Sequence, residues 1–216
     1  MPTALEELFV KTKSQNRAVL IGYIPAGFPN QKSSKKILKA MIDGGIDAVE
    51  IGYPYSDPVM DGPVIQAASE EAIKNGAGVN AVFDLLQEGV KQGIPSMVMS
   101  YWSPIEKYGV ENFSKKVSEL GGSGVITPDL TVEESNEWLS YSKTFDLNRI
   151  YVVAPSSSSE RLSKVTEQCS GFIYAASLMG VTGTRTSVSS GAPDLVARIR
   201  TTSGLPVAVG LGVSTR

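Results

Sequence analysis

The stretch AVEIGYPYSDPVMDGP, residues 48–63, decides how the rest of this sequence is interpreted. It begins as a short run of apolar and small residues that is typical of a buried strand, and Gly52 ends that run. Glu50 lies within the run, where a carboxylate is costly unless it is paired, hydrogen-bonded or protonated. A loop stiffened by three prolines follows and carries a further acid, Asp61. The stretch therefore predicts one carboxyl group at a strand end and another in the adjoining loop.

These two carboxyl groups have a chemical and a structural interpretation. Carboxyls in different surroundings can have different pKa values, so that one exchanges protons while the other stabilises charge. In the structural interpretation, Glu50 bonds to the backbone at its strand end and Asp61 caps a helix. The residues alone leave both interpretations open.

The composition excludes several kinds of site. The 216 residues contain no histidine and one cysteine, Cys169. Histidine triads, histidine general bases, and zinc sites built from cysteine or histidine are therefore excluded, as is an intramolecular disulfide. Acid–base chemistry must fall to Asp, Glu, Tyr or Lys, and we expect no metal site.

Charge and hydropathy argue against nucleic acid and membrane as partners. The net charge is −2 and the basic residues are scattered, whereas a nucleic-acid-binding domain usually gathers them on one face. No apolar run approaches the ~20 residues that span a bilayer, and no signal peptide is recognisable. The single cysteine suits a reducing compartment, and we expect a cytoplasmic protein.

Short apolar runs ending in Gly or Pro alternate with helical patterns along the chain. The seven predicted strands are residues 18–24, 46–52, 96–102, 124–127, 149–154, 172–177 and 206–209. The predicted helices are residues 3–13, 32–43, 64–74, 81–91, 110–120, 131–141, 159–169 and 193–201. Thr3 with Glu6, and Thr131 with Glu134, have the spacing of a capping box at a helix start. Asn80 is the expected N-cap of the helix at 81–91.

Regular alternation of strand and helix predicts an α/β fold with a parallel sheet and helices outside it. A doubly wound sheet usually has one glycine-rich loop near its first strand, whereas here Gly, Pro and polar residues follow nearly every strand. That distribution favours a (β/α)8 TIM barrel, in a single domain over residues 1–216. Because such a barrel typically has ~250 residues, we expect its last helix, strand and helix to be missing from this chain.

The active site of a TIM barrel lies at the C-terminal ends of its strands. Those ends offer Tyr23, Glu50, Tyr101, Asp129 and Tyr174, and also Ser177, but no lysine for Schiff-base chemistry. Each tyrosine could equally be ordinary barrel packing. Glycine-rich turns at 180–183 and 210–212 follow neighbouring late strands, where barrels often bind phosphate, although such turns are common without a ligand.

These motifs together resemble one family, the tryptophan synthase α subunit. VEIGYPYSDPVMDGPVIQ at 49–66 is similar to the family's signature. Further similar segments follow the family's order: PAGFP at 25–29, MSYWSPIEKYG at 99–109, TPDLTVEE at 127–134, APSSSSER at 154–161, GFIYAASLMGVTG at 171–183 and PVAVGLGVST at 206–215. The resemblance implies a TIM-barrel lyase of tryptophan biosynthesis that cleaves indole-3-glycerol phosphate into indole and glyceraldehyde 3-phosphate. It implies no cofactor in this chain, and a β subunit that carries pyridoxal phosphate as partner in an α2β2 heterotetramer.

By position in the matching motifs, the resemblance implies that Glu50 and Asp61 are the catalytic residues. It places Tyr23 and Tyr101 in the lining of the indole pocket and Tyr174 beside the glutamate.

The resemblance also implies a phosphate site and a closing loop. Thr182 would lie in the loop that closes over the substrate, and Gly183 and Gly212 would contact the phosphate. Leu178 departs from the pattern, because many members have arginine there, so that loop closure would use other contacts.

Other functions remain open from the sequence. One is a stand-alone indole-3-glycerol phosphate lyase that needs no β subunit, and another is a truncated α subunit with mainly a binding or allosteric role. A phosphate-sugar isomerase or a flavin-binding barrel is a third, but neither explains the S-D-P-x-x-D-G-P loop.

Overall fold

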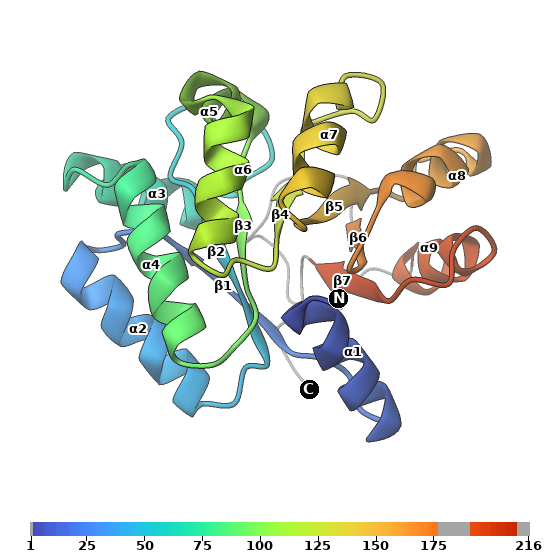
Figure 1. Cartoon of the computed structure of the whole chain (residues 1–216), viewed down its shortest axis with the longest axis horizontal. Helices are drawn as coiled ribbons and strands as arrows, with labels where there is room; N and C mark the ends of the chain where they lie inside the picture. Colours follow the sequence, from blue (N-terminus) through green and yellow to red (C-terminus); the bar gives the residue numbers. More distant parts are fainter. Residues whose placement is uncertain (1, 177–190, 211–216) are drawn as a thin grey trace.

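Seven parallel strands form one curled sheet with helices around its outside in the computed structural model, which describes residues 2–176 and 191–210 (Figure 1). The strands lie in chain order, and among the described residues the first and the last each pair on one side only. They are β1 Ile21–Pro25, β2 Ala48–Gly52, β3 Ser96–Met99, β4 Gly124–Thr127, β5 Asn148–Val153, β6 Ile173–Ala176 and β7 Val207–Gly210. The predicted α/β, TIM-barrel-like architecture is confirmed.

The helices connect successive parallel strands and cover one face of the sheet, as crossover connections require. They are α1 Ala4–Ser14, α2 Gln31–Asp43, α3 Pro63–Lys74, α4 Val79–Lys91, α5 Trp102–Tyr108, α6 Val110–Glu119, α7 Asn136–Thr144, α8 Ser159–Gln168 and α9 Gly191–Arg200. Helix α1 is the exception, because it precedes the first strand.

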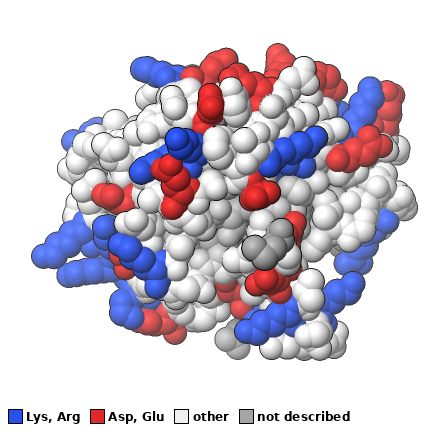
Figure 2. All heavy atoms as spheres, in the orientation of Figure 1, with Lys and Arg blue, Asp and Glu red and all other residues white. Residues whose placement is uncertain are grey.

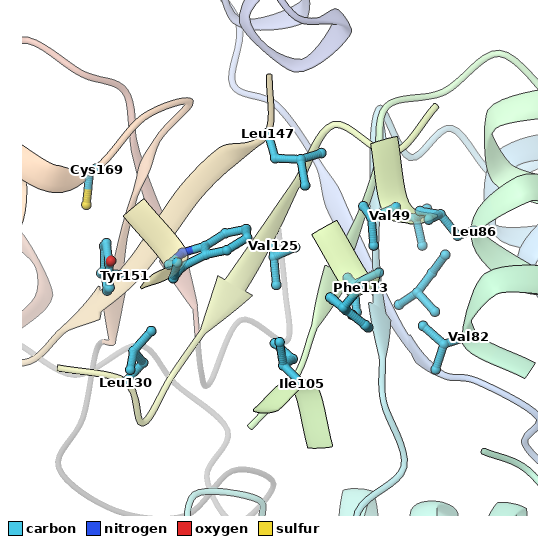
Figure 3. Packing of buried hydrophobic residues seen from close by; sticks show 14 of the residues in the cluster. Val49, Val82, Leu86, Ile105, Phe113, Val125, Leu130, Leu147, Tyr151 and Cys169 are labelled. Atoms are coloured by element: carbon cyan, nitrogen blue, oxygen red, sulfur yellow. The ribbon is translucent and has the colours of Figure 1, made fainter. Parts of the chain in front are cut away.

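The strands separate two apolar layers because alternate side chains point to opposite faces. Val49 belongs to the outer layer between sheet and helices, together with Leu86 and Phe113 (Figure 3). Ala48 belongs to the inner layer, and Glu50 shares its face by alternation. Glu50 therefore faces the interior of the curled sheet.

Helix α1 packs on the inner layer at the N-terminal end of the strands. Its Leu5 is fully buried in one cluster with Ala48, Met97, Ile126, Ile150 and Phe172. The predicted capping box of α1 is present, because the Thr3 N–H donates to Glu6 Oε2 at 2.7 Å and the Glu6 N–H to Thr3 Oγ1 at 3.3 Å. Asn148 Nδ2 also donates to Thr3 Oγ1 at 2.7 Å, which ties the helix start to β5.

Helix α5 was not predicted. Residues 96–102 were predicted to be one strand, but β3 ends at Met99 and Trp102 begins the helix. The Trp102 N–H donates to the carboxylate of Asp129, at 2.9 Å from Oδ1 and 3.2 Å from Oδ2. A residue from the next strand end thus terminates the strand pattern.

Two predicted helix starts were also wrong. Helix α4 begins at Val79 after Gly78, so Asn80 lies inside it rather than capping it. Helix α7 begins at Asn136, later than predicted. The Thr131 hydroxyl does bond to Glu134 at 3.1 Å, but within the turn that precedes the helix.

We expect Leu5→Ala to destabilise the fold by about 2–5 kcal/mol, because it empties a buried site in the inner layer. Val10→Ala on the same helix is the matched control, since Val10 is 72% exposed and should change stability little. Urea unfolding measures both. Equal destabilisation by the two variants would contradict the packing of α1 on the inner layer.

Candidate active site

A pocket lies where the C-terminal ends of the first strands meet residues 53–62, which we call the acidic loop. It contains about 250 Å³ of empty space and is partly open to solvent. Its lining residues are Tyr23, Tyr53, Asp61, Met99, Ser100, Tyr101 and Pro128. Three residues predicted from the sequence, Tyr23, Asp61 and Tyr101, therefore line the same pocket.

Glu50 lies in the middle of β2, in register with Tyr23 of β1 and Met97 of β3. The residue is 6% exposed and makes no hydrogen bond to any other residue in the described part of the chain. Burial in this surrounding disfavours the charged form and raises the pKa of the carboxyl to about 8. At neutral pH, Glu50 is therefore mostly protonated and can give a proton.

Asp61 differs from Glu50 because it has a hydrogen-bond partner. The Tyr101 hydroxyl bonds to its carboxylate, which lowers the pKa of Asp61, while partial burial raises it more. The same Tyr101 hydroxyl accepts the backbone N–H of Met60 at 2.9 Å. Burial raises the pKa of Tyr101 to about 12, so its hydroxyl keeps its proton and can donate it in a hydrogen bond to Asp61. Gln66 Nε2 donates to the Asp61 backbone carbonyl at 2.8 Å and holds the end of the loop.

Electrostatic effects on Tyr23 link the predicted residues to one another. Burial raises the pKa of Tyr23, and the charges of Asp61, Glu50, Tyr101 and Tyr174 each raise it further. Burial also raises the pKa of Tyr174, with a contribution from the charge of Glu50. Interactions of this kind need short distances, so the five side chains lie around one space.

Two glycines make room for two of these tyrosines. A Cβ added at Gly52 would lie 2.2 Å from the Tyr23 hydroxyl oxygen, and one added at Gly210 would lie 2.0 Å from that of Tyr174. In both cases the glycine is two residues beyond the register partner of the tyrosine on the next strand. Any larger residue at these strand ends would displace a ring that faces the interior.

The phosphate part of the prediction cannot be placed, because Thr182, Gly183 and Gly212 lie outside the described residues, as does Leu178. The sequence reasoning missed four residues that line the pocket: Tyr53, Met99, Ser100 and Pro128. Tyr53 and Ser100 each follow directly after a strand, so their place at a strand end is the signal that would have found them.

Other kinds of site find little support in the described residues. Within residues 2–176 and 191–210, no group of three or more acidic, cysteine or histidine side chains could hold a metal ion. No helix in this part of the chain has the length and apolar character to cross a membrane. On the face drawn in Figure 2, acidic and basic side chains are interspersed rather than gathered by sign.

Comparison with known proteins gives a consistent result. The sequence profile of the tryptophan synthase alpha chain family matches residues 9–216. The alpha chain of Nocardia farcinica is 51% identical over 209 residues, which is 97% of this chain and 79% of that one. The alpha chain of Acidothermus cellulolyticus is 47% identical over 213 residues, 99% of this chain and 80% of that one.

Solved structures agree with the sequence comparisons. Tryptophan synthase of Mycobacterium tuberculosis, in space group F222, superposes with a TM-score of 0.94 at 44% identity and covers 99% of this chain and 82% of that one. The tryptophan synthase a2b2 complex of Pyrococcus furiosus contains a chain with a TM-score of 0.84 at 34% identity, over 92% of this chain and 80% of that one.

We expect Glu50→Gln to stabilise the protein above neutral pH. The folded state, with the pKa near 8, binds more protons than the unfolded chain, whose glutamate has a pKa of about 4.3. The free energy of unfolding therefore falls as pH rises between these two values, and stays lowered above them. Glutamine cannot ionise, so its advantage should be small at pH 5 and grow to roughly a few kcal/mol at pH 8.5.

Urea unfolding of wild type and Glu50→Gln at the two pH values measures this difference. Glu167→Gln on α8 is the control, because that residue is exposed and should leave the pH dependence unchanged. An advantage of Glu50→Gln that does not depend on pH would show that Glu50 is not neutral in the folded state.

Proposed function

The chain belongs to the tryptophan synthase alpha chain family, and we propose that Glu50 and Asp61 carry the reaction of that family in this protein. The reaction is the retro-aldol cleavage of indole-3-glycerol phosphate to indole and glyceraldehyde 3-phosphate, a carbon–carbon lyase step of tryptophan biosynthesis. The observation that supports these roles most strongly is Glu50, a buried carboxyl with a raised pKa that faces the interior beside the pocket. Asp61 supports them from the pocket wall.

Glu50 acts first as general acid and then as general base. The protonated carboxyl gives its proton to C3 of the indole, which becomes an indolenine cation. The carboxylate that results is buried, and it takes the proton of the side-chain hydroxyl. The C3–C1′ bond then breaks, its electron pair returns to the ring, and the hydroxyl-bearing carbon leaves as the aldehyde. One carboxyl serves both proton transfers, and it ends the cycle protonated as it began.

Asp61 stabilises the intermediate. The cation carries its charge near N1, and an ionised carboxylate that accepts the N1–H is placed to offset it. The hydrogen bond from Tyr101 favours the ionised form of Asp61. Tyr23 and Tyr101 offer the flat apolar surface that an indole ring needs, and Tyr174 closes the space beside Glu50.

The rest of the proposal concerns the phosphate, the partner and the setting. Thr182, Gly183 and Gly212 would hold and cover the phosphate, as glycine-rich loops at late barrel strands do. The chain needs no cofactor of its own, and its partner is a pyridoxal-phosphate β subunit that receives the indole in an α2β2 assembly. The protein works in the cytoplasm, and residues 1–216 belong to a single barrel domain.

Release of indole from indole-3-glycerol phosphate, measured with and without added β subunit, tests the proposed activity. We expect turnover that increases when the β subunit is present. Turnover that is the same in both conditions, without complex formation on gel filtration, would favour a stand-alone lyase. Complex formation without any turnover would leave the binding or allosteric role.

Glu50→Gln should lower kcat for indole release by about 10²–10⁴-fold, the usual contribution of a general acid–base group, with KM nearly unchanged. The exposed Glu167→Gln is again the control and should keep wild-type activity. A Glu50→Gln protein that retains more than half of the activity would refute the assignment.

Asp61→Asn should lower kcat by roughly 10²–10³-fold, because a neutral amide cannot offset the charge of the intermediate. Asp57→Asn is the matched control in the same loop, since Asp57 is exposed and bonds only to the neighbouring Ser56 hydroxyl at 2.6 Å. Steady-state kinetics of both variants measures the difference. Similar losses in the two would indicate a general effect on the acidic loop rather than a role of Asp61.

A further inference from the structure

We propose that Asp129, at the end of β4, is a positioning residue for the Asp61 carboxylate and acts through helix α5 and Tyr101. The inference rests on the proposed function, because it concerns how the charge that Asp61 supplies is held at the pocket wall. Asp129 lines no part of the pocket itself. Three contacts carry the argument, and each joins a different pair of elements.

The first contact caps helix α5. The carboxylate of Asp129 accepts the backbone N–H of Trp102, the first residue of the helix, at 2.9 Å and 3.2 Å from its two oxygens. Tyr101 occupies the N-cap position but makes no side-chain capping bond of its own. A carboxylate at this position satisfies a free N–H and interacts favourably with the helix dipole. Asp129 therefore supplies from another strand end the cap that the helix lacks.

The second contact fixes the backbone on the other side of Tyr101. The Ser100 N–H donates to the Ile126 carbonyl of β4 at 3.1 Å, and the Ser100 hydroxyl donates to the Tyr101 carbonyl at 2.8 Å. Tyr101 is thus held between Ser100 and Trp102, and both of these neighbours are bonded to residues at the C-terminal end of β4. Its side chain is 6% exposed, so it has little room to take another orientation.

The third contact reaches the acidic loop. The Tyr101 hydroxyl accepts the Met60 N–H at 2.9 Å and bonds to the carboxylate of Asp61. Met60 and Tyr101 are 41 residues apart in the sequence, so the loop is held by a residue outside it. A shift in the start of α5 would move this hydroxyl away from both partners, and Asp61 would lose the bond that favours its ionised form.

The alternative is that Asp129 only stabilises a local turn, and the pH profile separates the two roles. The groups that affect Asp61 are the Tyr101 hydroxyl and burial, with Tyr23 and Glu50 nearby. If Asp129 acts through Tyr101, its removal weakens the bond from Tyr101 and raises the pKa of Asp61. The acid limb of the pH profile of kcat/KM should then move to higher pH, which a loss of stability alone does not cause.

The experiment compares indole release by Asp129→Ala, Asp129→Asn, Tyr101→Phe and the Asp129→Ala/Tyr101→Phe double variant. Asp129→Ala should lower kcat/KM by about twofold to thirtyfold, the range that loss of one helix cap spans, and should move the acid limb upward. Asp129→Asn keeps an acceptor oxygen for Trp102 and should retain most of the activity. In the Tyr101→Phe background, Asp129→Ala should add less than about a twofold effect, because coupled residues are not additive.

Asp47→Ala is the matched control. Asp47 also accepts a backbone N–H, that of Leu20, at 2.8 Å, but it lies before β2 at the opposite end of the strands. Its removal should leave the pH profile and kcat/KM unchanged. If Asp129→Ala does not fold, Asp129→Glu replaces it, since the longer side chain keeps the charge but displaces the cap and should move the acid limb in the same direction.

The possible failures are distinguishable. A wild-type protein that releases no indole overturns the proposed function and the inference with it. An active wild type whose Asp129 variants keep the wild-type pH profile overturns the inference alone. So does an Asp129→Ala loss that is equally large in the Tyr101→Phe background, because Asp129 would then act by another route.

Discussion

The burial of the Glu50 carboxyl inside the curled sheet is the constraint on which the rest of the site depends. The residue is 6% exposed, and among the described residues nothing donates a hydrogen bond to it. The cost of charging such a group keeps it neutral until about pH 8. Its neighbours in register, Tyr23 and Met97, need not compensate a charge, which allows the interior to stay aromatic and apolar. A cation beside Glu50 would stabilise the wrong protonation state for an acid.

The same interior explains the pairing of tyrosines with glycines. Tyr23 and Tyr174 face inward from strands on either side of the sheet, and each hydroxyl lies where a Cβ on the next strand would be. Gly52 and Gly210 remove that Cβ. The rings can therefore lie across the ends of neighbouring strands, while burial keeps both phenols protonated. A glycine that looks like a strand terminator in the sequence thus shapes the inner surface.

The sequence predicted what depends on local pattern. Apolar runs that end in glycine or proline located the strands, and Glu50 stood out because a charge interrupts such a run. Contacts between distant residues were not readable in this way. Residues 96–102 read as one strand because Tyr101 and Trp102 are aromatic, and only Asp129, 27 residues later, makes Trp102 a helix start. The Met60–Tyr101 bond has the same character, since neither residue carries a local signal for the other.

The two acids are separated in role by hydrogen bonding more than by burial. Burial raises the pKa of both, so it cannot by itself make one an acid and the other a counter-charge. The difference is Tyr101, whose hydroxyl favours the ionised form of Asp61, whereas no described residue does the same for Glu50. This arrangement needs the acidic loop to be fixed to β3 and α5 rather than to β2, from which it emerges. Because the donor comes from another part of the chain, Asp61 can be tuned without any change in the strand that holds Glu50.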